Sequence, residues 1–386
     1  MSNSPPFLPF ARPDITEDEV TAAAEAIRSG WLTTGPNAAA FEREFAEHVG
    51  GDVTAIAVNS ATAGLHLALE ALGIGPGDEV LVPTWTFTAT AEVVRYLGAD
   101  PVMVDVDAAS LNLDLAAAEA AVTERTRAIM PVHFAGLPVP QEPLRALADR
   151  HELSVVEDAA HAIPASEDGH HVGSGRNEAG VFSFYATKTI TTGEGGMVTV
   201  TDDAVAARIR TMRLHGISRD VFDRYQSTTP SWHYEVVAPG FKYNLADPAA
   251  AIGRVQLGRA HAMGLARAAI AVRYDEAFAD LPLRLPAHAP EGSEHAWHLY
   301  VVRLEDGAPL DRDGFVSRLA ELGVGTSVHF IPLHLHPYWR ERYALRPEDL
   351  PVATREFDAA VSLPIWSAMS DGDVDRVIAM VRKVLQ

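Results

Sequence analysis

The chain has 386 residues, enough for two or three domain-sized units, and 47% of them are hydrophobic, so we expect a large core. Its 31 Lys and Arg residues against 52 Asp and Glu residues give a formal net charge of −21, which argues against nucleic acid and anionic membranes as partners. Cysteine is absent, which excludes disulfides, thiolate zinc sites and cysteine nucleophiles, and no metal site is predicted. Residues 1–6 show no signal-peptide pattern and no apolar run reaches the ~18 residues of a membrane span, so we predict a cytoplasmic protein.

Short apolar runs alternate with helix-like segments through the first two thirds of the chain. The apolar runs predict buried strands, and a helix over 65–72 follows the first of them; the strands are expected at residues 55–58, 79–82, 101–106, 128–132 and 154–158. Continuous apolar strands between helices are typical of a parallel α/β sheet that is covered on both faces.

The pattern changes near residue 245. An alanine-rich helix is predicted over 247–279, and a last helix over 371–385. Between them, alternating segments at 297–304 and 325–330 flank an amphipathic helix at 311–322. We therefore predict a large α/β domain at 1–245 and, at 246–386, a helical connector with a smaller α+β domain.

Lys188 lies between an apolar aromatic run (182–185) and a glycine-rich turn (193–196). A lysine held in a dry pocket loses part of its basicity, and its neutral amine becomes a nucleophile for an aldehyde cofactor. The alternative interpretation is an exposed lysine on a loop.

Asp158 ends a predicted strand thirty positions before Lys188. Ligands bind at the carboxyl ends of parallel strands, where an aspartate can pair with a protonated pyridine nitrogen. The alternative is an N-cap of a following helix. His161 is a candidate to lie against the cofactor ring or its 3-hydroxyl, or is simply a packed histidine.

The segment 60–64 follows a strand and opens a helix with small residues, so its backbone N–H groups can approach a phosphate. Helix capping would use the same residues. Ser183 can add a hydroxyl donor. Phe87 is a candidate to stack on a flat heterocycle, with Trp85 as the alternative, and either can be core.

Together these segments resemble the sugar aminotransferases of the DegT/StrS family over nearly the whole chain. The resemblance includes residues 7–13, 29–36, 59–69, 73–80, 157–161, 183–196, 240–245 and 251–257. It implies a fold-type I aminotransferase fold, with a large, mostly parallel sheet domain, that uses pyridoxal 5′-phosphate to aminate nucleotide-linked keto sugars. Residues 238–245, 295–299 and 363–364 look closest to the enzyme that forms UDP-4-amino-4-deoxy-L-arabinose, which favours amination at C4.

The resemblance implies a role for each matching residue. Lys188 forms the Schiff base with the cofactor, Asp158 pairs with the pyridine nitrogen, and His161 and Phe87 lie beside and against the ring. The phosphate is held by Ala61, Thr62 and Ser183.

Two segments depart from the family pattern. Many members carry Asn-Tyr-Arg where this chain has Lys242-Tyr243-Asn244, and that asparagine reaches a phosphate across a dimer interface. Lys242 or Asn244 is expected to make this contact. The segment 329–334 resembles the family's substrate-side loop but differs from the arabinose-type enzymes. Residues predicted to contact substrate are Trp31, Thr33, His329 and His334.

The resemblance implies a ping-pong reaction with L-glutamate as amino donor, 2-oxoglutarate as product and a homodimer with shared active sites. Alternatives are amination at C3, a cyclitol ketone of the scyllo-inosose type as substrate, and a non-catalytic regulator. A pyridoxamine-dependent dehydratase of the same fold would carry histidine in place of Lys188. Neither the nucleotide nor the sugar stereochemistry follows from these residues.

Overall fold

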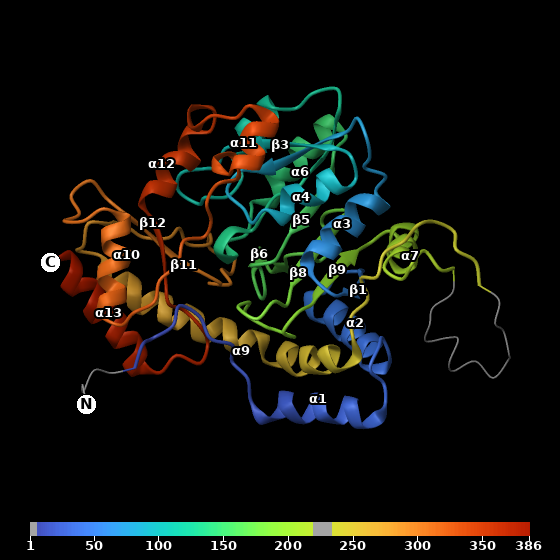
Figure 1. Cartoon of the computed structure of the whole chain (residues 1–386), viewed down its shortest axis with the longest axis horizontal. Coiled ribbons are helices and arrows are strands. Elements are labelled where there is room, and N and C mark those ends of the chain that lie inside the picture. Colours follow the sequence, from blue (N-terminus) through green and yellow to red (C-terminus); the bar gives the residue numbers. More distant parts are fainter. Residues whose placement is uncertain (1–5, 219–233) are drawn as a thin grey trace.

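The computed structural model describes residues 6–218 and 234–386, and a seven-stranded sheet forms the centre of the first part of the chain (Figure 1). The strands lie in the order β1 (Thr54–Val58), β9 (Gly196–Val200), β8 (Ala179–Ser183), β5 (Ser154–Asp158), β4 (Thr126–Ile129), β2 (Glu79–Pro83) and β3 (Asp100–Val104). β9 runs antiparallel to both of its neighbours, and the other neighbouring pairs are parallel. The predicted mostly parallel α/β sheet is confirmed.

Helices cover both faces of this sheet because successive strand residues point to opposite sides. On β2, Val80 and Val82 join a core with the helices of one face, whereas Leu81 joins a core on the other. The first face carries α3 (Ala61–Ala71), α4 (Ala89–Tyr96) and α7 (Asp203–Met212). The second carries α5 (Leu115–Ala120) and α6 (Gln141–His151), and α2 (Pro36–Val49) packs on β1, β8 and β9.

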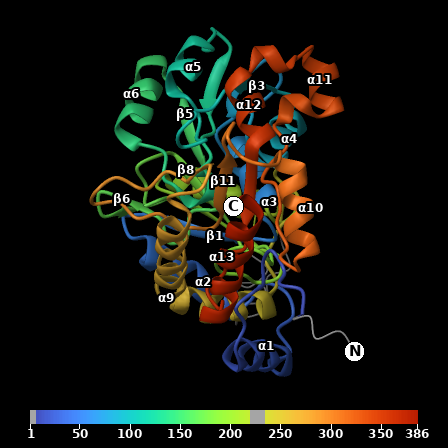
Figure 2. The same ribbon diagram turned by 90° about the vertical axis from the view of Figure 1, so that its left-hand side faces the viewer.

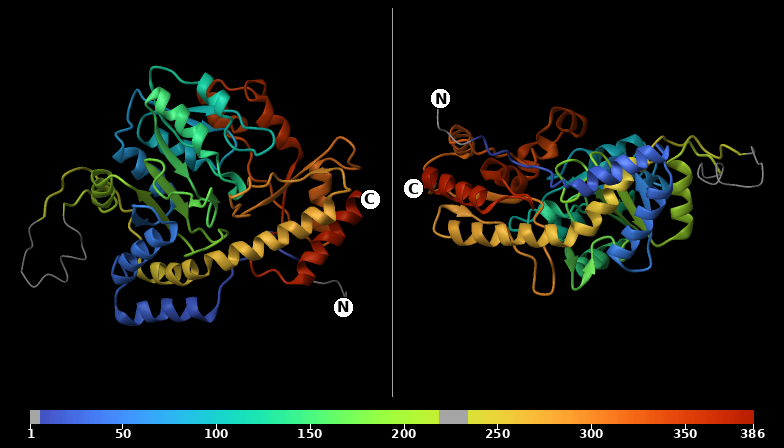
Figure 3. Two further views of the ribbon diagram at one scale, coloured as in Figure 1. Left: turned by 180° about the vertical axis from the view of Figure 1, so that it is seen from behind. Right: turned by 90° about the horizontal axis from the view of Figure 1, so that it is seen from below.

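The helix α9 (Asp247–Phe278) connects the two parts of the molecule. Its 32 residues span about 48 Å, and Pro248 stands in its first turn, where a missing N–H is tolerated. Leu257 packs in a core with α2, whereas Tyr274 and Phe278 belong to the C-terminal core. α1 (Glu17–Ser29) lies alongside α9, which extends toward the C-terminal helices when seen from behind (Figure 3).

The C-terminal part contains a three-stranded antiparallel sheet, β10 (Leu283–Arg284), β11 (Tyr300–Leu304) and β12 (Ala360–Leu363). α10 (Arg312–Glu321) and α13 (Asp371–Leu385) pack beside it (Figure 2). The remaining short elements are β6 (Ser166–Glu167), β7 (His170–His171), α11 (Pro337–Tyr343), α12 (Pro351–Ala359) and the 3₁₀ turns Phe134–Gly136, Leu333–Leu335 and Pro347–Asp349.

Two contacts cross the predicted domain boundary at 245/246, which stays a prediction. Leu8 of the N-terminal arm pairs with Val324 and lies in the C-terminal core. In the other direction, Leu333 and Trp339 pack into the core of the large sheet. The expected strand at 325–330 differs from the structure, where only an isolated bridge joins Ser327 to Ser362 on the free edge of β12. Among residues 6–218 and 234–386, no helix combines the length and apolarity needed to cross a membrane.

Candidate active site

Three predicted site segments meet at one edge of the large sheet. Asp158 is the last residue of β5 and pairs in register with Val181 of β8, two residues before Ser183 ends that strand. Ser183 in turn lies opposite Gly196 at the start of β9, and Gly196 lies opposite Val58 at the end of β1. The carboxyl ends of parallel strands are where this class of sheet binds ligands.

Asp158 is a buried carboxylate that accepts one hydrogen bond at each oxygen from neighbouring residues. Thr90 Oγ1 donates to its Oδ2 at 2.8 Å and is itself 2.8 Å from Thr86 Oγ1, while the Ala160 N–H donates to Oδ1 at 3.2 Å. Burial raises the pKa of Asp158, and the bonds from Thr90 and Ala160 and the charge of Lys188 oppose the rise. Residues 159–165 contain turns rather than a helix, so the helix N-cap alternative is wrong. The arrangement suits a carboxylate that awaits a cationic partner.

Lys188 follows β8 in a tight turn, in which its N–H donates to the carbonyl oxygen of Tyr185 at 2.9 Å. Burial lowers the pKa of Lys188 to about 8, and the charge of Asp158 acts in the opposite direction. A sizeable fraction of the amine is therefore neutral near neutral pH, as a nucleophile and proton-transfer group requires. The predicted glycine-rich turn follows, with Gly193 at φ +82°.

A row of four rings leads from the surface to the interior beside Lys188. The ring centroids of Phe87 and Phe330 are 5.8 Å apart, those of Phe330 and His161 are 5.9 Å apart, and those of His161 and His298 are 4.3 Å apart. Phe87 is 58% exposed and free to stack, whereas Trp85 is fully buried and donates through Nε1 to the His329 carbonyl oxygen. The stacking role thus stays proposed for Phe87, and Trp85 belongs to the core.

His161 is held as a neutral imidazole. Its Nδ1 accepts the Ala135 N–H at 3.3 Å, so the ring proton lies on Nε2, which is left to donate. Burial lowers the pKa of His161 far below its ordinary value, and the charges of Lys188 and His329 add to this effect. A neutral donor beside Lys188 suits an anionic oxygen on a flat ring.

The start of α3, the predicted phosphate-binding segment, lies at the same edge of the sheet. Ser60 caps the helix by accepting the Ala63 N–H at 3.1 Å. A Cβ at Gly196 would lie 2.7 Å from Ser60 C and 2.8 Å from Ala61 N, so only glycine lets β9 approach the helix this closely. Ala61, Thr62 and Ser183 are thereby gathered at a helix N-terminus, where a phosphate is stabilised.

Lys242, Asn244 and Thr33 lie elsewhere within this chain. Asn244 pairs with Val58 on the side of β1 opposite to β9. Lys242 Nζ donates to Asn244 Oδ1 at 2.5 Å, and Asn244 Nδ2 donates to Thr34 Oγ1 at 2.8 Å and approaches Thr33 Oγ1 at 3.5 Å. These residues form a cluster at the outer sheet edge and do not bond to Lys188 or Asp158. We call residues 33, 34, 242 and 244 the edge cluster.

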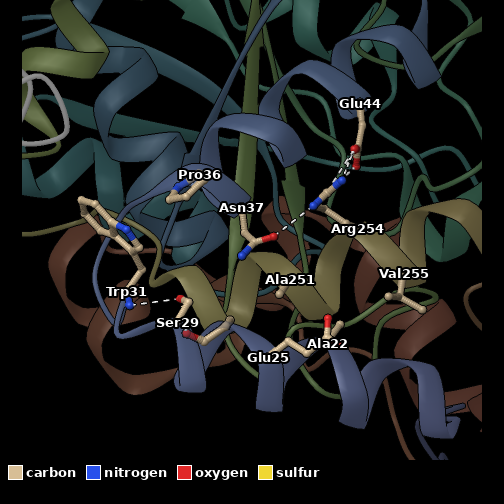
Figure 4. A pocket seen from close by; sticks show the side chains of 11 residues that line it. Ala22, Glu25, Ser29, Trp31, Pro36, Asn37, Glu44, Ala251, Arg254 and Val255 are labelled. Atoms are coloured by element: carbon tan, nitrogen blue, oxygen red, sulfur yellow. Dashed lines mark hydrogen bonds and ion pairs between the residues drawn. The ribbon is translucent and has the colours of Figure 1, made fainter. Parts of the chain in front are cut away.

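Trp31 lines a different cavity, of about 570 Å³, between α1, α2 and α9 (Figure 4). The backbone N–H of Trp31 donates to Ser29 Oγ at 3.2 Å. Arg254 lines the same cavity and bonds to Asn37 and Glu44. The structure therefore does not bring Trp31 to Lys188 within one chain.

The two histidines of the segment 329–334 are placed differently. His329 Nδ1 bonds to Ser362 Oγ at 2.9 Å, and burial together with the charge of Lys188 lowers its pKa to about 4. His334 is fully buried, and its two ring nitrogens bond to Thr84 and Thr354 at 2.7 and 2.8 Å. The charge of Lys188 acts on His329, which therefore lies near the Lys188 site. Both ring nitrogens of His334 bond instead to threonines inside the protein.

Sequence reasoning missed Thr90 and His298. Thr86 and Thr90 follow a predicted strand end closely, and two hydroxyl side chains at such a position were a usable signal for a ligand-side network. His298 lies next to β11 of the C-terminal part, so its approach to His161 depends on the tertiary fold.

Known relatives share this architecture along nearly the whole chain. The spore coat polysaccharide biosynthesis protein SpsC of Bacillus subtilis is 44% identical over 98% of this chain and 97% of its own length. Structures of the sugar aminotransferase Spr1654 of Streptococcus pneumoniae include a PMP-form that matches with a TM-score of 0.91 at 34% identity, covering 98% of each chain. S. venezuelae DesV in complex with a ketimine intermediate matches with a TM-score of 0.88 at 36% identity and the same coverage.

The fold and these relatives define a pyridoxal-phosphate-dependent aminotransferase of fold-type I. The chain belongs to the DegT/DnrJ/EryC1/StrS aminotransferase family, whose sequence profile matches residues 13–382. The predicted family, enzyme class and cofactor are thus confirmed, and the individual site residues stay predictions.

Proposed function

We propose that this protein transfers an amino group from L-glutamate to a nucleotide-linked keto sugar, a dTDP- or UDP-linked 4-keto-6-deoxyhexose or 4-keto pentose. The product is an amino sugar for natural-product or cell-surface glycan biosynthesis. The observation that carries the proposal is the meeting of Lys188, Asp158 and the start of α3 at one edge of the sheet, with the pKa of Lys188 lowered to about 8.

Each residue of the site then has one task. When bound, pyridoxal phosphate supplies an aldehyde and a ring that accepts the electron pair released from the substrate carbon. Asp158 would pair with the ring nitrogen and favour its protonated form. Lys188 would hold the cofactor, and its amine would serve as the proton-transfer group. His161 would offer its Nε2–H to the ring oxygen, and Phe87 would stack on the ring.

The start of α3 would anchor the cofactor through its phosphate. Ala61, Thr62 and Ser183 would hold it at the N-terminus of α3, where the backbone N–H groups and the helix dipole favour a negative charge. The same residues that would bind the phosphate would thereby help to orient the cofactor relative to Lys188.

The edge cluster supports a homodimer as part of the proposal. Lys242 and Asn244 stand in the segment where the family places its phosphate contact across the interface, and within this chain they bond to each other and to Thr34 rather than to Lys188 or Asp158. An identical partner chain would receive them in its site, because a two-fold axis brings the same surface to both subunits. The substrate-contact roles of Trp31 and Thr33 would be explained in the same way, and that of His329 within one chain.

The assay that tests the function follows 2-oxoglutarate release from L-glutamate in the presence of a panel of dTDP- and UDP-linked keto sugars. Turnover with at least one 4-keto sugar is expected. Turnover with scyllo-inosose and none of the sugars would replace the proposal by a cyclitol aminotransferase, and preference for a 3-keto sugar would move the amination to C3. L-glutamine in place of glutamate tests the donor.

A further inference from the structure

His298 forms the inner end of the aromatic row and lies deep in the site. It is 6% exposed, and its ring centroid is 4.3 Å from that of His161. Its Nδ1 is buried and has no hydrogen-bond partner among the described residues. The neighbouring imidazoles differ, since Nδ1 of His161 bonds to the Ala135 N–H and Nδ1 of His329 bonds to Ser362 Oγ.

The backbone around His298 is held in an unfavourable arrangement. Trp297 has φ +48°, a conformation that a bulky residue rarely adopts and that persists where surrounding structure enforces it. The buried Arg267 enforces it by donating from Nη1 to the carbonyl oxygens of Trp297 at 3.2 Å and of His298 at 3.3 Å. A Cβ at Gly136 would lie 2.9 Å from the His161 carbonyl oxygen and 3.1 Å from Trp297 N. The fold therefore clamps the two histidine segments together.

Packing alone does not account for a histidine at this position. A phenylalanine ring would fill the same space without an unpaired buried nitrogen, which destabilises the folded protein. Strain and unpaired polar groups that a protein retains at a site are typical of groups that a ligand completes.

The charge state of His298 indicates the chemistry of that ligand. Burial lowers the pKa of His298 far below its ordinary value, and the charges of His161, Lys188, Arg267 and His329 act in the same direction. A neutral imidazole nitrogen complements a hydroxyl group, which can donate or accept, whereas a carboxylate is bound best by a cation.

We propose that His298 Nδ1 forms a hydrogen bond with a hydroxyl group of the keto-sugar substrate, so that His298 is a specificity-determining residue for the second half of the reaction. The proposal rests on the proposed function. The amino donor, whose polar groups are charged, does not use this nitrogen.

Two substitutions separate the contribution of the His298 nitrogen from that of its ring. His298→Phe keeps a ring and removes both nitrogens, and His298→Asn places an amide near the position of Nδ1. The first half-reaction is measured in single turnovers with L-glutamate, as loss of the absorbance of the lysine-bound cofactor. The second is measured by mixing the pyridoxamine phosphate form with the panel of dTDP- and UDP-linked 4-keto sugars and following the return of that absorbance.

We expect His298→Phe to keep the rate of the glutamate half-reaction within about twofold of the wild-type rate. The sugar half-reaction should be about tenfold slower, the effect of one lost hydrogen bond to a neutral group. His298→Asn should recover part of the loss. A second readout needs no turnover: in the Lys188→Ala protein loaded with pyridoxamine phosphate, adding His298→Phe should weaken binding of the reactive sugar about tenfold by calorimetry, with no fall in Tm.

Equal slowing of both halves, slowing of the glutamate half alone, or no slowing would each overturn the proposal. If the wild type completes the glutamate half but reacts with no sugar of the panel, the proposed sugar substrate fails and this inference fails with it. If the wild type reacts with a sugar of the panel and only the variants fail to behave as expected, this inference fails and the proposed function stands.

Discussion

The surroundings of Asp158, which we call the inner corner, differ from the edge cluster in how far their polar groups are buried. Asp158 is 5% exposed and bonds to Thr90 and Ala160, in a setting that lowers the pKa of the nearby Lys188. Lys242 is exposed and bonds to Asn244. The residues of the inner corner come from one chain, where burial lowers the pKa of Lys188 and the charge of Asp158 opposes this change. The edge cluster lacks such desolvation, and we infer that only a second subunit would supply it. Five experiments test this difference.

Lys188→Ala should have the largest effect. Loss of both the cofactor link and the proton-transfer group is expected to reduce turnover by about 10⁴-fold or more. Lysine also occurs at positions 242 and 383, so borohydride reduction followed by peptide mapping shows which lysine carries the cofactor. Lys383→Ala, on the exposed side of α13, is the matched control and should keep wild-type labelling and turnover. Cofactor found on another lysine would refute the assignment.

Asp158→Asn should rank second, with turnover lower by about 100- to 1,000-fold, because the ring nitrogen loses its anionic partner. Thr90→Val keeps the charge and removes one hydrogen bond to it, so a loss of only about tenfold is expected. Steady-state kinetics on both variants, with cofactor content measured by absorbance, check the ranking. A Thr90 variant as impaired as Asp158→Asn would show that the hydrogen bond matters more than the charge.

Gly196→Ala should weaken cofactor binding by about 10- to 100-fold. The added Cβ would collide with the start of α3, and displaced N–H groups lose a charge-assisted bond to the phosphate. Gly75→Ala is the control, because a Cβ there meets no atom within 4 Å. Equilibrium dialysis with pyridoxal phosphate measures both. An unchanged affinity in Gly196→Ala would place the phosphate elsewhere.

The pH dependence of reconstitution tests the state of Lys188. The neutral amine attacks the aldehyde, and its pKa is lowered from 10.5 to about 8. The rate at which apoprotein binds pyridoxal phosphate covalently should therefore rise about tenfold per pH unit below pH 8 and level off above it. Asp158→Asn removes a charge that raises this pKa, so its plateau should begin at lower pH. A rate that still climbs steeply near pH 10 would indicate an ordinary, exposed lysine.

Lys242→Ala should have the smallest effect, a loss in cofactor affinity of about tenfold. The Lys242→Ala variant also allows a complementation experiment. If Lys242 serves the partner's site, mixing Lys242→Ala chains with Lys188→Ala chains gives mixed dimers with one intact site. After random exchange of two-fold dimers, about half of the sites that keep Lys188, a quarter of all sites, should regain wild-type cofactor affinity, measured by titrating activity with pyridoxal phosphate. No recovery, with exchange verified by mass spectrometry, would assign Lys242 to its own chain or to no site.

Much of the inner site was predictable because its signals are local. Asp158 stands at a strand end and Lys188 before a glycine-rich turn, and strand ends of a parallel sheet converge by geometry. Thr90 was missed although its hydroxyl and that of Thr86 closely follow a predicted strand end. The packing of Trp85 and His334 was not readable, because a tryptophan or histidine in an apolar run has the same sequence signature whether it faces a ligand or a core.

The sequence by itself determined the α/β class and the resemblance to the aminotransferase family, and it predicted Lys188 and Asp158 for the cofactor chemistry, because strand periodicity and short motifs are properties of neighbouring residues. Only the tertiary structure decided how the C-terminal part completes the site. His298 is 137 positions from His161, and Arg267 and Gly136 bring the two together through contacts that no local pattern encodes. The same holds for the edge cluster, where the pairing of Asn244 with Val58 and its bond to Lys242 join segments that are far apart in the sequence.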